Sequence, residues 1–203
     1  VTMLIRHWRR EGALQADLDT TLRGIVGVTG YCVDFVRVYL AAAHAAGLFC
    51  RQWAFSFDGF GGHGHTFVEV FDRDRGRWAF IDVHNNVYAV LGGTDEPMGA
   101  LALRSALVNA PGSVEFRRAG PGRLGYPHSD KLLDYYRRGT RQWYLWWGND
   151  VVTQERSGVV GVLSRISGTW TYRLAVAIGH RPKLVALVTP ENRQEVARLT
   201  SLR

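Results

Sequence analysis

The sequence has little lysine, little cysteine and no long apolar run, and each shortage narrows what the protein can be. Only two of its 25 basic residues are lysines, Lys131 and Lys183, so the net charge of +7 comes almost wholly from arginine. The arginines are scattered, as on a solvated surface, and we therefore expect no nucleic-acid partner. No stretch reaches the ~20 apolar residues of a membrane-spanning helix. We therefore expect no transmembrane segment. The sequence does not identify the cellular compartment, although the cytoplasm is favoured.

The two cysteines, Cys32 and Cys50, are too far apart for a disulfide if residues 32–47 form one helix. A helix of that length spans about 24 Å at ~1.5 Å per residue. A disulfide requires Cα atoms within about 7 Å of each other. Cys50 follows the helix by only three residues and cannot fold back that far. We therefore expect two free thiols with different roles.

The overall composition is that of a folded α+β protein. Hydrophobic residues make up 46% of the 203 residues and charged residues 21%, which is typical of a globular chain rather than a disordered one. We expect one core domain over residues 1–152, followed by an α/β extension of unknown role over residues 153–203.

Apolar periodicity and turn residues predict the individual elements. Residues 32–46 are apolar nearly all round, interrupted only by Asp34, Arg37 and His44, and predict a buried helix. Further helices are expected over residues 2–11, 14–22, 97–108, 129–139 and 191–199. Strands are expected over residues 51–57, 65–72, 77–82, 159–166, 170–178 and 184–188. Residues 24–30, 58–64 and most of 110–127 are expected to be loops, and the strands around residues 73–76 to form a hairpin. The aromatic and aliphatic residues of that hairpin are expected to pack against the central helix.

Three side chains in this stretch have the chemistry of a thiol-nucleophile site. Cys32 begins the predicted helix, where unpaired backbone N–H groups and the helix dipole favour an anion. His65 begins one strand and Asp82 ends the next. Antiparallel neighbours place the start of one strand beside the end of the other, so His65 and Asp82 can meet. A thiol needs a nearby base to react at neutral pH, and a histidine needs a partner on its second nitrogen to hold its tautomer.

The same stretch resembles the core of the transglutaminase-like cysteine enzymes, which are relatives of the papain-like proteases. Four segments carry the resemblance, in order and at fitting spacing. They are Gly30-Tyr31-Cys32, Gly47-Leu48-Phe49-Cys50-Arg51, His65-Thr66-Phe67-Val68-Glu69-Val70, and Trp78 shortly before Asp82. Together they cover about a quarter of the chain.

The resemblance implies a papain-like α+β fold whose central helix carries the cysteine and packs on an antiparallel sheet. It implies that Cys32 is the nucleophile, His65 the base and acid, and Asp82 the group that orients His65. The implied reaction is acyl transfer at an amide of a peptide or protein through a thioester. Hydrolysis is favoured over transglutaminase-type transfer. No cofactor is implied, and no acidic cluster suggests the calcium dependence of the animal enzymes.

Other interpretations remain open. The chain could be a catalytically inactive binding module that keeps the fold, or an acyltransferase that uses a thioester cofactor. A zinc site is another interpretation, because His63 and His65 form a His-x-His pair with His84 nearby in sequence. His63 and His84, however, have no defined place in the family pattern. His63 is expected in the loop near the cleft.

Three further features are left with alternatives. The aromatic cluster of residues 143–147 is either core packing or an apolar wall for the substrate. Cys50 is expected to be a core residue. The backbone N–H of Cys32 is the natural first donor to an oxyanion, and Gln15, Thr29 and Trp8 are candidates for the second.

Overall fold

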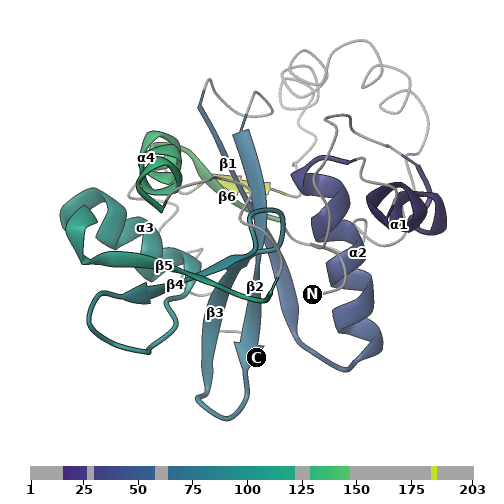
Figure 1. Ribbon diagram of the computed structural model, residues 1–203, viewed down its shortest axis with the longest axis horizontal. Helices are drawn as coiled ribbons and strands as arrows, with labels where there is room; N and C mark the ends of the chain where they lie inside the picture. The colour runs from purple at the N-terminus through teal and green to yellow at the C-terminus, as the bar shows by residue number, and fades with distance from the viewer. Residues whose placement is uncertain (1–15, 27–29, 58–63, 122–128, 147–183, 187–203) are drawn as a thin grey trace.

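A seven-stranded antiparallel sheet forms the centre of the computed structural model, which describes residues 16–26, 30–57, 64–121, 129–146 and 184–186 (Figure 1). The strand order is β5-β4-β3-β2-β1-β6-β7. The strands are β1 (Cys50–Ser56), β2 (Gly64–Asp72), β3 (Arg77–Asp82), β4 (Val87–Leu91), β5 (Val114–Arg118), β6 (Trp143–Trp146) and β7 (Leu184–Ala186). The helices are α1 (Leu18–Val26), α2 (Cys32–Ala45), α3 (Ala100–Asn109) and α4 (Ser129–Gly139), with a 3₁₀ turn at Pro111–Ser113. The protein is therefore α+β.

Helices cover both faces of the sheet. Figure 1 shows α1 and α2 on one side and α3 and α4 on the other. One core joins the sheet to α2 and contains Phe35, Val36, Val38, Tyr39, Leu40, Val68 and Val83; the other joins it to α3 and α4 and contains Trp53, Phe55, Phe67, Phe80, Leu103, Leu132, Tyr136 and Trp143. Side chains alternate along a strand, so Phe67 and Phe80 face α3 and α4. The expectation that they pack against the central helix is wrong.

The β2–β3 hairpin is the part of the sheet that its sequence predicts most fully. The turn over residues 73–76 is held by the Asp72 carboxylate, which accepts the backbone N–H groups of Asp74 and Arg75. Gly76 takes a φ of 63° there, which suits a residue without a Cβ. The resulting register pairs Val68 with Ile81 and brings the start of β2 alongside the end of β3.

Helix α2 forms where the apolar run predicts it, and two of its polar residues are buried rather than solvated. Asp34 is 1% exposed and accepts the backbone N–H of Tyr31 at 2.8 Å. Arg37 is 6% exposed and donates to the carbonyl of Ala16, next to α1, at 2.9 Å. Of the three polar residues that interrupt the apolar run, only His44 is exposed. These contacts fix the start of α2, where Cys32 lies, against its surroundings.

Several expected boundaries are wrong. Helix α1 continues through Gly24 instead of ending there. Pro97 pairs as an isolated bridge with Val90, and α3 begins three residues later, at Ala100. Residues 84–127, expected to hold little but loop and one helix, also contain β4 and β5.

Other expectations lie on residues that the structure does not describe. They are the helices at 2–11 and 191–199 and the strands at 159–166 and 170–178. Strand β7, from the proposed extension, pairs with β6 in the same sheet. Among the helices of the described residues, none has the length and apolar character needed to cross a membrane.

Candidate functional site

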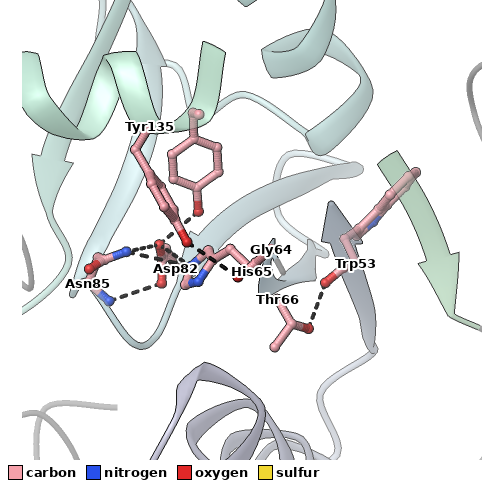
Figure 2. A network of polar contacts seen from close by, with 8 residues as sticks. Trp53, Gly64, His65, Thr66, Asp82, Asn85 and Tyr135 are labelled. Carbon is pink, nitrogen blue, oxygen red and sulfur yellow. Dashed lines mark hydrogen bonds and ion pairs between the residues drawn. The ribbon is translucent and has the colours of Figure 1, made fainter. Parts of the chain in front are cut away.

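His65 and Asp82 meet where β2 begins and β3 ends, as the antiparallel arrangement predicts. The His65 Nε2 atom lies 2.7 Å from Asp82 Oδ2. His65 is 5% exposed and Asp82 is fully buried, so bulk water does not screen the contact. Figure 2 shows Asp82 lying between His65 and Asn85. The two residues therefore form a buried imidazole–carboxylate pair.

Two residues that the sequence did not single out complete the surroundings of Asp82. Asn85 donates its backbone N–H to Asp82 Oδ1 at 2.9 Å and its side-chain amide to Oδ2 at 2.6 Å (Figure 2). The Tyr136 hydroxyl, from α4, donates to the same Oδ2 at 2.7 Å. An Asp followed three residues later by Asn is a turn pattern that could have identified Asn85. No local signal marks Tyr136, which is 54 residues away in sequence.

These contacts explain the charge state of the pair. Burial by itself lowers the pKa of His65, but the charge of Asp82 and then that of Cys32, with a hydrogen bond to each, raise it to about 10. Burial by itself raises the pKa of Asp82, but the charge and hydrogen bond of His65, with the donors Asn85 and Tyr136, lower it. At neutral pH the ring is therefore an imidazolium and the carboxyl group a carboxylate.

Cys32 completes the arrangement from the first residue of α2. Its side chain is half-buried, and it acts on the pKa of His65 through both charge and a hydrogen bond. Gly30, two residues before Cys32, has a φ of 139°, a backbone conformation that suits glycine. A Cβ at this position would lie 3.4 Å from the Asp34 side chain. The three predicted residues thus come together around one imidazole.

Arg51 and Glu69, which belong to the segments that carry the resemblance, are not part of the Cys32–His65–Asp82 group and form a buried ion pair. Arg51 Nε lies 2.6 Å from Glu69 Oε2, and the side chains are 13% and 2% exposed. Glu69 also accepts the indole N–H of Trp53 and the backbone N–H of Ala100, the first residue of α3. The Arg51 guanidinium stacks 3.8 Å from the Trp78 ring centroid. These residues hold α3 against the sheet, and nothing places them at the thiol.

The second cysteine and the aromatic cluster of residues 143–147 lie in the packed core where the structure describes them. Cys50 is a free thiol packed beside the α2 core, and burial raises its pKa to about 12. Trp143 is fully buried between Trp53 and Phe67. Its place is that of core packing, whereas the side chains of residues 146 and 147 are not described.

Two of the three histidines of the zinc interpretation, His65 and His84, lie in the described part of the chain. The His84 ring centroid lies 5.6 Å from that of His65 and 5.5 Å from that of Phe35. Within the described ranges, no group of three or more His, Cys, Asp or Glu side chains could hold a metal ion. His63 lies outside those ranges, as do the oxyanion candidates Trp8, Gln15 and Thr29.

Comparison with known proteins adds no relative. No protein-family model matches the chain, and neither does any curated protein or solved structure. The interpretation of the site therefore depends on its own geometry and on the motif residues that carry the resemblance.

Proposed function

We propose that the protein is a thiol enzyme that transfers the acyl group of an amide or ester through a thioester on Cys32. The observation that carries the proposal is the buried His65–Asp82 contact at 2.7 Å with Cys32 acting on the same imidazole. Such an arrangement supplies a nucleophile, a proton carrier and a group that orients the carrier. A papain-like fold of the transglutaminase type belongs to the same proposal. It is supported by a cysteine-bearing helix packed on an antiparallel sheet that bears the histidine and the aspartate.

The proposed reaction has two halves. The Cys32 thiolate attacks the carbonyl carbon, and a C–S bond forms while the carbonyl π electrons move onto oxygen. The imidazolium of His65 then gives its proton to the leaving amine as the C–N bond breaks, which leaves a thioester. In the second half, His65 takes a proton from water as the water oxygen attacks the thioester. The C–S bond breaks, and a carboxylic acid and the thiolate are released.

The position of Cys32 also suits the tetrahedral intermediate. The first N–H groups of an α-helix have no acceptor within the helix. The backbone N–H of Cys32 is therefore the proposed first donor to the oxyanion. Asp82 stays ionised throughout and stabilises the imidazolium that each half of the reaction uses.

An activated ester tests the proposal, because its acyl group can be trapped on the nucleophile. The protein is mixed with p-nitrophenyl acetate at neutral pH, quenched in acid and digested, and each cysteine peptide is weighed. We expect a rapid release of p-nitrophenol and an acetyl group on Cys32. The variant Cys32→Ala should lose the adduct, whereas Cys50→Ala should keep it, because the raised pKa of the Cys50 thiol keeps it protonated.

The outcome distinguishes the proposal from its alternative. Absence of an adduct on Cys32 in folded protein would contradict acyl transfer and favour the inactive binding module. Where the adduct forms, glutamine-containing peptides incubated with and without a primary amine separate hydrolysis from transfer. We expect the free acid to form in both reactions, which is the hydrolytic result.

A further inference from the structure

One oxygen of Asp82 receives more donors than orientation of His65 alone requires. Its Oδ2 atom accepts from His65 Nε2 at 2.7 Å, from the Asn85 amide at 2.6 Å and from the Tyr136 hydroxyl at 2.7 Å. Asn85 belongs to the turn that follows Asp82, so its contact is local. Tyr136 comes from α4, which follows the motif by more than 40 residues in sequence. Its hydroxyl is therefore a tertiary contact that the motif does not contain.

The Tyr136 side chain has no freedom to move away from this contact. It is fully buried, and its ring centroid lies 5.2 Å from those of Phe55 and Phe116 and 5.5 Å from that of Phe80. Burial and the charge of Asp82 raise the pKa of its hydroxyl well above the ordinary value. The group therefore stays protonated and serves as a fixed donor.

We propose that Tyr136 is a positioning residue of the thiol site, whose hydroxyl holds the Asp82 carboxylate toward His65 and shares the negative charge of the Oδ2 atom. The inference builds on the proposed function of Cys32. The Tyr136 ring also packs edge-on against the His65 ring, with 5.9 Å between the centroids, but the proposed role belongs to its hydroxyl, which acts through Asp82. It makes α4, which lies outside the motif, part of the machinery.

The direction of the effect follows from the charges around His65. The titratable groups that face its ring are Asp82 from β3, Cys32 from α2, His84 from the turn after β3, and Tyr135 and Tyr136 from α4. A donor to Oδ2 points its positive end at that oxygen and stabilises the negative charge of the carboxylate, which then attracts the imidazolium proton less strongly. Deleting that donor therefore strengthens the hold of Asp82 on the proton, and the pKa of His65 rises further.

The test removes the one oxygen atom. In Tyr136→Phe we expect the pKa of His65, measured by NMR titration of histidine-labelled protein, to rise by about half to one unit. Acetylation of Cys32 by p-nitrophenyl acetate should slow about tenfold, because the carboxylate that orients the imidazole loses one of the donors that fix its position. The matched control is Tyr144→Phe. Its hydroxyl donates to the Gln142 side chain, so both quantities should stay unchanged.

A purely structural role for Tyr136 would lower stability without moving the His65 titration. An unchanged His65 pKa in folded Tyr136→Phe overturns the inference, whatever the acetylation result. If that variant does not fold, 3-fluorotyrosine at position 136 keeps the ring and makes the hydroxyl a stronger donor, so the pKa should fall; no change there also overturns it. The titration does not require activity. Failure of the proposed function, seen as no adduct in the wild-type protein, is therefore distinguishable from failure of this inference.

Discussion

Asp82 shows how a carboxylate can be completely buried and still carry its charge. An isolated ionised group would be strongly disfavoured in this position. Asp82 instead accepts hydrogen bonds from the backbone and side chain of Asn85, from Tyr136 and from His65. The donors satisfy both oxygens, and the imidazolium balances the charge. The two charges therefore stabilise each other. Removing one of them should lower the free energy of unfolding, because the other would stay buried without its counter-ion.

The contribution of this pair to stability should depend on pH in a defined direction. The pKa of His65 is raised on folding, so its contribution is complete below its ordinary value of about 6.5 and is lost as pH rises toward about 10. The pKa of Asp82 is lowered, so its contribution is present above about pH 4 and is lost as pH falls through the folded-state value. Urea unfolding of Asp82→Asn near pH 6 should show a loss of about 3–5 kcal/mol.

The same comparison at higher pH supplies the check. The difference between wild type and Asp82→Asn should shrink steadily from pH 6.5 to pH 10, because the unfolded chain loses the His65 proton over this range while the folded protein keeps it up to about pH 10. Asp134→Asn is the control, since the Asp134 side chain is 70% exposed and its ion pair with Arg137 lies on the surface, where such pairs contribute little. A difference that stays constant over this range would mean that His65 is not an imidazolium in the folded state.

At this scale the sequence predicts which three groups meet but not what surrounds them. Cys32, His65 and Asp82 can be found because each has a distinctive place at the start or end of an element. Tyr136 cannot, because only the packing of α4 onto the sheet brings it to Asp82. Arg51 and Glu69 belong to the same motif, yet the structure gives them a different task.

Among the elements, α3 is attached to the sheet by a buried carboxylate in addition to its core residues. Glu69 of β2 accepts the N–H of Ala100 at the start of the helix and binds Arg51 on β1. Gly99 fits closely beside it, since a Cβ there would lie 3.1 Å from Glu69 Oε1 and 3.2 Å from the Trp78 carbonyl oxygen. One side chain thus joins two strands and a helix.

Replacing Glu69 by Gln should destabilise the fold strongly while leaving the thiol chemistry intact. The change leaves the Arg51 charge buried without its counter-ion, which costs about 3–5 kcal/mol. Urea denaturation measures the loss. Under conditions where the variant stays folded, Cys32 should acetylate at the wild-type rate, because Glu69 contacts none of the three site residues.

The matched control is Glu96→Gln. Glu96 also pairs with an arginine, Arg77, but its side chain is 66% exposed, so the change should cost less than about 1 kcal/mol. Equal losses in the two variants would contradict the buried role of Glu69.

The elements that sequence reasoning predicted well are those with strong periodicity. Helix α2, helix α4 and the β2–β3 hairpin have long apolar patterns or clear turn residues. Strands β4 and β5 have only five residues each, too few for alternation to outweigh the glycines and prolines around them. The proline at position 97 favoured a helix start, but its backbone instead bridges Val90 at the sheet.

The whole molecule places the site between its two cores. Cys32 comes with α2, whose core covers one face of the sheet, while His65 and Tyr136 pack with the aromatic core on the other face. Neither core alone assembles the three groups. The reactivity of Cys32 should therefore be a property of the folded chain and not of its local sequence.

Competitive alkylation of the two cysteines tests the central claim most directly. With iodoacetamide at neutral pH and mass-spectrometric readout, Cys32 should react at least about 100-fold faster than Cys50, whose raised pKa leaves roughly one thiolate in 10⁵. His65→Ala should slow only Cys32, and unfolding in urea should bring the two rates together. Equal rates in the native protein, or a Cys32 rate that His65→Ala leaves unchanged, would contradict the account.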